Sequence, residues 1–378
     1  MKIAIDASRA ANEKAGIGRY TKEIIENLLK IDKVNQYILF FSYFRRDKEK
    51  ERYIESLKAC RPARVKVKFL KIPGSLKEET WQWKINWLEK FLDEPDVFFA
   101  PSFFEVNFGL KTPQVMTIHD LTTFMYPEHR GREVSSRLSK RVKEAAQIAT
   151  KIITLSRSAA TDAEKFLQVP SSKIEVIYPG LSVLARASNN LPEGLKSKSY
   201  LLYVGTIEPR KNLIGLLRSY EMLPERLQKK YPLVIVGAKG WNTGKIWRVL
   251  KSLKSKENIK FMGYLPDSIL AKLYKEAAIF AYPSLYEGFG LPPLEALSFG
   301  LPVVTSNCSS LPEVTGEAAV QIDPTDNKSI ARAIQRLLGD SSARIDLGKK
   351  GKKQARKFSW EKAAKETLKV FEEMQQGL

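Results

Sequence analysis

Two acidic residues eight positions apart, Glu287 and Glu295, open and close the segment EGFGLPPLE. The apolar run 279–283 before this segment and the run 301–305 after it predict two buried parallel strands. Consecutive prolines suit the first turn of a helix, and a glycine suits its C-terminal end, so a glycine-rich loop and a helix join the two strands. We expect both carboxylates to face the crevice at the carboxyl ends of the strands, where open α/β sheets bind ligands.

The loop between the two acids predicts an anion site made by the main chain. Two of its four residues are glycines, which lets backbone N–H groups approach a phosphate, and the helix start behind them adds positive potential. The carboxylates themselves would repel a phosphate and fit hydroxyl groups better, as a nucleotide sugar presents on both sides of its pyrophosphate. The alternative is a solvated loop before an ordinary amphipathic helix. The predicted loop residues are Gly288, Phe289, Gly290 and Leu291.

A second candidate anion site follows the strand predicted at 200–204. The segment GTIEPRKN places Arg210 and Lys211 directly before a predicted helix, so two cations stand beside exposed backbone N–H groups. This arrangement predicts a pyrophosphate cradle. A pair of solvated surface cations is the alternative. The chain has no Asp-x-Asp pair, so we predict no metal site.

The spacing in EGFGLPPLE, with ALSFGLPVV after it, resembles that of the retaining GT-B glycosyltransferases of family 4, also called group 1. The segments GIGRY, TIHDL and EPRKN are most similar to the mannosyltransferase-like branch. The resemblance covers nearly the whole chain and is strongest in its second half. It implies a GT-B fold, in which two doubly wound Rossmann-like α/β domains face a central cleft.

The resemblance also implies roles for the charged residues. Glu295 would bind the ribose of the donor, and Glu287 would bind the hydroxyls of the donor sugar. Arg210 and Lys211 would bind the pyrophosphate as negative charge develops on the leaving group. Many family members carry arginine where this chain has Thr206, so the resemblance leaves open which of the two cations reaches the phosphate.

Two further sites come from the first half of the chain. His119 follows the strand predicted at 114–118, and the resemblance implies that it holds the transferred sugar; on its own it would be a structural histidine. Gly16 and Gly18 resemble the glycine loop that reaches toward the donor phosphate. A plain tight turn explains the two glycines equally well.

The expected reaction is retaining transfer of a hexose from a nucleotide diphosphate sugar to a glycan or lipid-linked glycan, as in polysaccharide biosynthesis. GDP-mannose is the favoured donor and UDP-sugars follow, and no cofactor is expected. The alternative is a nucleic-acid-binding or regulatory protein built on a degenerate glycosyltransferase scaffold. Steep salt dependence of binding to DNA or RNA would distinguish that alternative.

Length and composition agree with two domains. The chain has 378 residues, of which 43% are hydrophobic, enough for two cores. We predict an N-terminal acceptor-side domain at 1–185, joined by a C-terminal helix at 359–378. A nucleotide-sugar-binding domain at 186–358 lies between them in the sequence.

A formal charge of +21, spread almost evenly over the two halves, favours anionic partners. The basic run at 349–357 lacks interleaved aromatic residues, so nucleic acid is not the favoured partner. The basic helix predicted at 132–149, with Arg137, Lys140 and Arg141, has a solvated face that could equally rest on anionic lipid.

The sequence predicts a cytoplasmic location. Cys60 and Cys308 are far apart and are expected to be free thiols in a reducing compartment. Asp6 interrupts the first apolar run, so no signal-peptide core is predicted, and no apolar stretch is long enough for a membrane span. Membrane contact is therefore expected only at the surface, on the inner face of the cell membrane.

Overall fold

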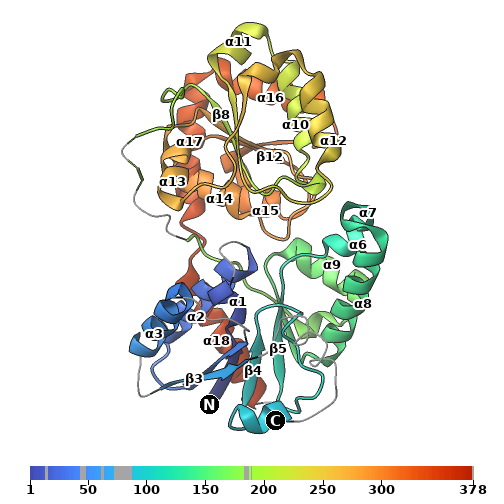
Figure 1. The fold of residues 1–378 in the computed structure, drawn as a ribbon, viewed down its shortest axis with the longest axis vertical. Helices are drawn as coiled ribbons and strands as arrows, with labels where there is room; N and C mark the ends of the chain where they lie inside the picture. Colours follow the sequence, from blue (N-terminus) through green and yellow to red (C-terminus); the bar gives the residue numbers. More distant parts are fainter. Residues whose placement is uncertain are drawn as a thin grey trace. The chain divides into compact units, whose positions relative to one another are not determined.

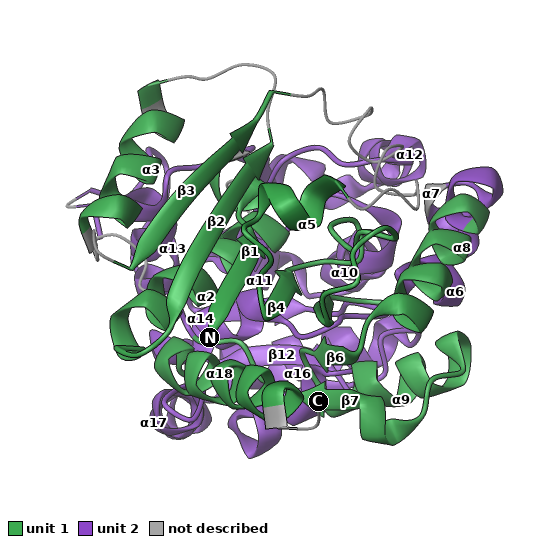
Figure 2. Cartoon of the chain, turned by 90° about the horizontal axis from the view of Figure 1, so that it is seen from below, with its two compact units in different colours: residues 1–121, 136–180, 359–378 green, residues 122–135, 181–358 purple. Residues whose placement is uncertain are grey.

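The computed structural model describes residues 1–12, 16–42, 48–60, 64–71, 87–182, 187–188 and 190–376. Its contacts divide the chain into two compact units, which Figure 2 distinguishes by colour. The first unit comprises residues 1–121, 136–180 and 359–378, and the second comprises residues 122–135 and 181–358. The boundary predicted at residue 185 falls outside the described residues and stays a prediction.

The described strands of the first unit form a seven-stranded parallel sheet in the order β3-β2-β1-β4-β5-β6-β7. Figure 1 labels β3, β4 and β5 among them. Most strands of this sheet are short apolar runs, and β1, β4 and β5 are almost fully buried because helices cover both faces of a parallel sheet. The strands are β1 (Lys2–Asp6), β2 (Gln36–Ser42), β3 (Val65–Leu70), β4 (Val97–Ala100), β5 (Gln114–Ile118), β6 (Lys151–Thr154) and β7 (Ile174–Val176).

The last helix of the chain, α18, belongs to the first unit and packs against α2 and β4. The Phe371 ring lies 5.5 Å from that of Phe99, and the Trp360 ring lies 5.7 Å from that of Tyr20. Gly180 makes the close approach to α18 possible, because a Cβ there would lie 2.1 Å from the Trp360 nitrogen. The helices with residues in this unit are α1 (Ser8–Asn12), α2 (Ile17–Ile31), α3 (Lys48–Cys60), α5 (Trp87–Phe91), α8 (Arg132–Ile148), α9 (Arg157–Leu167), η1 (Ser171–Lys173) and α18 (Trp360–Gln376).

The second unit repeats the design with a six-stranded parallel sheet in the order β10-β9-β8-β11-β12-β13. The two parallel sheets confirm the predicted pair of doubly wound domains. The strands are β8 (Leu201–Val204), β9 (Leu233–Val236), β10 (Ile259–Phe261), β11 (Ile279–Tyr282), β12 (Val303–Ser306) and β13 (Ala319–Ile322).

Several helices of the second unit begin at side chains that accept a backbone N–H group. Asn212, Asp326 and Asp340 each cap a helix in this way, which satisfies an amide that would otherwise lack a partner. The helices are α6 (Thr122–Met125), α7 (Pro127–Arg130), η2 (Pro209–Lys211), α10 (Leu213–Glu221), α11 (Glu225–Lys230), α12 (Gly244–Ser252), η3 (Lys254–Asn258), α13 (Asp267–Glu276), α14 (Leu291–Ser298), α15 (Leu311–Thr315), η4 (Gly316–Ala318), α16 (Asn327–Gly339) and α17 (Ser341–Ala355).

Within the described residues, no helix combines the length and the apolar character that crossing a membrane requires. The same residues contain no group of three or more His, Cys, Asp or Glu side chains arranged to hold a metal ion. Cys308 carries a free thiol, as predicted, and the side chain of Cys60 lies outside the described part of the structure.

Candidate active site

Three of the predicted site residues meet where the order of the second sheet reverses. Arg210 and Lys211 follow β8 in the turn η2, and Glu287 follows β11, the neighbour of β8. From β8 the chain proceeds outward to β9 and β10, and from β11 it proceeds the other way to β12 and β13. Loops diverge at such a point, and the crevice between them is the usual ligand site of an open α/β sheet.

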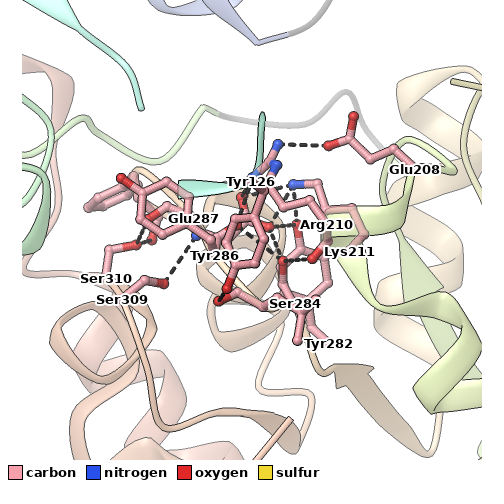
Figure 3. A network of polar contacts seen from close by, with 12 residues as sticks. Tyr126, Glu208, Arg210, Lys211, Tyr282, Ser284, Tyr286, Glu287, Ser309 and Ser310 are labelled. Carbon is pink, nitrogen blue, oxygen red and sulfur yellow. Dashed lines mark hydrogen bonds and ion pairs between the residues drawn. The ribbon is translucent and has the colours of Figure 1, made fainter. Parts of the chain in front are cut away.

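The Glu287 carboxylate binds both cations directly (Figure 3). Lys211 Nζ donates to both carboxylate oxygens, at 2.6 Å and 2.8 Å, and Arg210 Nη1 donates to Oε2 at 2.8 Å. All three side chains are largely buried, with between 7% and 12% of their surface exposed. Charge-assisted hydrogen bonds in so dry a setting are strong, so these residues form one rigid group.

Two hydroxyl groups complete the surroundings of Glu287. The Tyr282 hydroxyl donates to Oε1 at 2.8 Å, and Ser284 Oγ donates to the same oxygen at 2.7 Å. Lys211 Nζ also donates to the Tyr282 oxygen at 2.8 Å. A carboxylate has about four lone-pair sites. Glu287 is therefore saturated, and a sugar hydroxyl could bind it only if a present contact gives way.

The two cations hold Glu287 in its ionised form. Burial opposes ionisation of Glu287, but Lys211 and Arg210 outweigh it and lower the pKa of its carboxyl group to about 2. Burial and the neighbouring Arg210 lower the pKa of Lys211, while Glu287 and Glu208 oppose that shift. Glu287 is consequently an anion throughout the neutral pH range.

A second carboxylate, which the sequence analysis did not assign, holds the other side of Arg210. Glu208 is only 1% exposed, and its Oε1 accepts from Arg210 Nη2 at 2.8 Å. Arg210 Nη1 also donates to the Tyr286 carbonyl oxygen at 2.8 Å. Two carboxylates thus balance two cations, where the sequence suggested a pair of cations awaiting an anion. The available signal was the position of Glu208 in EPRKN, two residues before Arg210.

The loop after Glu287 leads into α14, whose first turn has few backbone N–H groups. Gly290 has a φ of 110°, a conformation that favours glycine, and it immediately precedes α14. Pro292 and Pro293 lack N–H groups, so α14 cannot present the usual row of donors at its start. The Phe289 ring packs edge-on against Phe358, with centroids 5.5 Å apart. The Phe289 side chain is therefore buried against Phe358.

Two serines fix the shape of that loop. Ser309 Oγ accepts from the Glu287 backbone N–H at 3.1 Å. Ser310 Oγ lies 2.9 Å from the Glu287 carbonyl oxygen and 2.6 Å from that of Phe289. Neither serine was predicted as a site residue, because their contacts depend on how the loop after β12 folds back onto the loop after β11.

Glu295, the second predicted carboxylate, is bound by a tyrosine of α13. It is in the second turn of α14 and is 5% exposed. Its Oε2 accepts from the Tyr274 hydroxyl of α13 at 2.9 Å. The structure thus places Glu287 before α14 and Glu295 within it, as predicted, and what each binds stays a prediction.

Helices α6 and α7 group with the second unit, although their sequence precedes it by some distance. The Tyr126 hydroxyl donates to the Leu285 carbonyl oxygen at 3.5 Å, and its ring lies 6.3 Å from that of Tyr286. Asn242 Nδ2 donates to the His129 carbonyl oxygen at 2.6 Å. This segment therefore contacts the residues just before Glu287, a neighbour that the sequence did not predict (Figure 3).

In the first unit, His119 follows β5 directly, as predicted. Its Nε2 lies 2.8 Å from the Pro101 carbonyl oxygen, and its ring meets that of Tyr20 edge-on at 4.9 Å. The carbonyl can only accept, so a neutral ring carries its proton on Nε2 and leaves Nδ1 as an acceptor. Burial lowers the pKa of His119 to about 4, so the ring is neutral at neutral pH.

The two glycines of the first loop differ in setting. Gly16 is exposed, has a φ of 57° and immediately precedes α2. Gly18 is buried within the first turn of α2. Residues 13–15 of this loop lie outside the described part of the structure, and a role for either glycine in donor binding stays a prediction.

The basic helix α8 differs from expectation at one position. Arg137 and Lys140 are exposed, but Arg141 is only 7% exposed. Its guanidinium stacks on the Phe108 ring at 4.9 Å and donates to the Phe104 carbonyl oxygen at 3.3 Å. The prediction of Arg141 as a surface cation is therefore wrong, because the residue faces the loop after β4.

Comparison with known proteins agrees with this geometry. Residues 15–183 match the family model described as Glycosyltransferase Family 4, and residues 186–354 match the model described as Glycosyl transferases group 1. The chain is 31% identical to O-antigen chain mannosyltransferase B of Escherichia coli, over 98% of this chain and 99% of that protein. It is also 31% identical to a serotype-specific mannosyltransferase of Escherichia coli, over 75% of this chain and 37% of that longer protein.

Solved structures share the fold over the full length. The sucrose-phosphate synthase of Thermosynechococcus elongatus superimposes with a TM-score of 0.76 and 17% identity, covering 100% of both chains. The fold is GT-B, as predicted. The chain belongs to the family 4 (group 1) glycosyltransferases and is an enzyme of the hexosyltransferase class. Within that family it resembles the mannosyltransferases.

Proposed function

We propose that this enzyme transfers mannose from GDP-mannose to a hydroxyl group of a glycan or lipid-linked glycan, with retention of configuration at the sugar. Two observations support the proposal. The buried group of Glu287, Arg210 and Lys211 stands at the reversal point of the second sheet. The relative that matches over 98% of this chain is named as an O-antigen mannosyltransferase. The alternative of a nucleic-acid-binding protein has no comparable support.

The cation pair serves the leaving group in this proposal. When the bond between the sugar carbon and the phosphate oxygen breaks, both electrons stay with the nucleoside diphosphate, and its negative charge grows. Arg210 and Lys211 already stand in fixed positions, so they stabilise that charge without reorganising at the moment of reaction. Backbone N–H groups of residues 288–291 would add to this stabilisation.

Because Glu287 is saturated, donor binding requires an exchange of partners. The diphosphate takes up part of the hydrogen bonding of Arg210 and Lys211, and this releases carboxylate oxygens of Glu287. Those oxygens then accept from the sugar hydroxyls, in keeping with the role that the family resemblance implies. In a front-face reaction the acceptor oxygen bonds to the sugar carbon, and its proton passes to the departing phosphate.

The remaining site residues complete the proposal. Glu295 binds the ribose, and the Nδ1 of His119 accepts from a hydroxyl of the transferred sugar. Gly16 and Gly18 bring the first loop toward the donor. No metal ion or cofactor is invoked, because the two cations and the loop amides meet the charge of the diphosphate.

A ligand screen followed by a product assay tests the donor. We expect GDP and GDP-mannose to raise the melting temperature more than UDP, ADP or their sugars, since a ligand at 100 times its Kd stabilises the fold by about 2.7 kcal/mol. Nuclear magnetic resonance of the product from GDP-mannose and a mannosyl acceptor should show an α linkage. A larger shift with a UDP-sugar would contradict the donor, and a β linkage would contradict retention.

We also propose that the enzyme works at the inner face of the cell membrane as a peripheral protein. The exposed basic residues of α8 support this location, and they include Arg137 and Lys140. Residues of this kind are attracted to anionic lipid head groups. The acceptor in this proposal, a lipid-linked glycan, would be presented at that surface.

A further inference from the structure

The hydroxyl of Tyr274 donates a hydrogen bond of 2.9 Å to Oε2 of Glu295. We propose that Tyr274 is a positioning residue: it orients the Glu295 carboxylate toward the ribose and makes donor binding selective for a ribonucleotide over its deoxy analogue. This inference rests on the proposed function, in which Glu295 binds the ribose. It adds a residue for which the sequence suggested no role.

Tyr274 is held firmly enough to set the direction of another side chain. It is 0% exposed on α13, and its ring stacks on Phe299 with centroids 5.7 Å apart and an interplanar angle of 12°. The Phe280 ring lies 5.7 Å away, tilted by 52°. Because rings on β11 and after α14 fix the tyrosine, its hydroxyl has a defined position before any ligand arrives.

The orientation of Glu295 is the property that needs such support. The last torsion of a glutamate side chain is broad and roughly two-fold, so backbone position alone does not fix the carboxylate plane. A hydrogen bond to one oxygen restricts that plane, and a carboxylate has about four lone-pair sites in all. Vicinal hydroxyls of a ribose bind best to a carboxylate that is already oriented, because less freedom is lost on binding.

Tyr274 and Glu295 come from two neighbouring helices, α13 and α14. Figure 1 shows α13 beside α14, and the bond between Tyr274 and Glu295 joins them. Helix α13 runs from Asp267 to Glu276, so Tyr274 lies in its last turn.

A purely structural role for Tyr274 makes a different prediction. If the hydroxyl only satisfied a buried carboxylate, its removal would weaken the fold and affect all nucleotides alike. A role in ribose binding affects only nucleotides that carry ribose hydroxyls. The two explanations therefore differ in whether the loss of affinity depends on the ribose hydroxyls of the ligand.

The experiment compares GDP with 2′,3′-dideoxy-GDP by titration calorimetry on the full chain. Tyr274→Phe should weaken GDP binding about tenfold, a change of about 1.4 kcal/mol that suits the loss of one hydrogen bond to a charged group. Binding of the dideoxy nucleotide should change less than twofold. Equal weakening of both nucleotides, or no change for GDP, would overturn the inference.

Tyr200→Phe is the matched control. Tyr200 is also 0% exposed, and its hydroxyl donates to the Leu273 carbonyl oxygen of the same helix at 2.7 Å. Its loss should lower the melting temperature without changing the ratio of GDP to dideoxy-GDP affinity. A changed ratio in this control would mean that any disturbance of α13 alters ribose binding, and would overturn the specific role of Tyr274.

A second variant keeps the test open if Tyr274→Phe folds poorly. Phe299→Leu removes the stacked ring and loosens Tyr274 without removing its hydroxyl. We expect a smaller loss, about threefold, confined to GDP. Equal loss for both nucleotides in this variant would again overturn the inference. Failure of the wild type to bind GDP, UDP or ADP would instead overturn the proposed function on which it rests.

Discussion

The site residues at the strand ends are charged in the second unit and neutral in the first. In the second unit, Glu208, Arg210, Lys211 and Glu287 are four largely buried charges that balance one another. In the first unit, His119 is kept neutral by burial and is oriented by a carbonyl oxygen. The same doubly wound architecture thus supports an electrostatic site in one unit and a nearly neutral hydrogen-bonding site in the other.

The difference follows from what each proposed ligand group requires. A departing diphosphate gains charge, so its site needs cations that are already in place. A sugar hydroxyl gains no charge when the bond to the phosphate breaks, so a neutral hydrogen-bond acceptor is sufficient for it. Burying the charged site costs more desolvation free energy than burying the neutral one, because each buried ion must be compensated by its partners.

The largest effect is expected where a buried cation is lost. Lys211→Met removes two bonds to Glu287 and leaves that carboxylate under-compensated, so we expect a loss of about 3–5 kcal/mol in unfolding free energy. Transfer should fall by at least about 100-fold. Denaturant unfolding and a donor-turnover assay measure the two effects. Lys229→Met is the control, because its pair with Glu225 is 69% and 75% exposed and should matter little.

A double variant sharpens the same point. If Lys211 and Glu287 depend on each other, Lys211→Met combined with Glu287→Gln should destabilise the fold by at least about 1 kcal/mol less than the sum of the single changes. Additive losses would indicate that the two residues stabilise the unit independently. The charged site would then not be a cooperative group.

The next effect concerns Glu208, which holds Arg210 without meeting Glu287. Glu208→Gln replaces a charge-assisted bond of 2.8 Å with a neutral one, so Arg210 should be less firmly positioned. We expect KM for the donor to rise about tenfold, in line with the value of a hydrogen bond to a charged group. Steady-state kinetics with varied donor tests this. An unchanged KM with a lowered melting temperature would reduce Glu208 to a structural role.

The sequence predicted which residues of the charged site follow buried strands. Arg210, Lys211 and Glu287 each come after an apolar run, and the family resemblance, rather than the runs themselves, assigned them to one ligand. The supporting residues could not be found in this way. Tyr282 and Ser284 reach Glu287 because of how their side chains are oriented in the fold, which the local sequence does not indicate. Glu208 was recognisable only as a charged residue next to a proline.

In the first half of the chain, one residue was assigned a position that the structure contradicts. Arg141 has the spacing of a surface cation on a basic helix, yet its stem and guanidinium bury against Phe108. Helical periodicity gives the face of a helix but not which loop covers it. The grouping of residues 122–135 with the second unit was not predicted for the same reason: it depends on long-range packing rather than on a local sequence pattern.

The neutral site makes a prediction about pH. The folded chain holds the pKa of His119 at about 4, below its usual 6.5, because burial disfavours the charged ring. Between pH 6.5 and 4 the unfolded chain binds a proton that the folded chain does not, so this contribution to stability is complete above pH 6.5 and is lost as the pH falls toward 4. The unfolding free energy of wild type minus that of His119→Asn should therefore decrease from pH 7 to 4.5. A constant difference would contradict the neutral state of His119.

The smallest effect is expected at the surface of α8. Replacing Arg137 and Lys140 by Glu should weaken sedimentation with vesicles containing anionic phosphatidylglycerol, by about 1 kcal/mol for each basic residue removed from the lipid surface. Both residues are exposed, so the melting temperature should stay unchanged. The matched control is Lys365→Glu with Lys369→Glu on α18, which changes the net charge equally at residues that are 63% and 74% exposed. Equal weakening by both pairs would show that overall charge, rather than α8, governs the attraction. No weakening by either pair would contradict membrane contact through these charges.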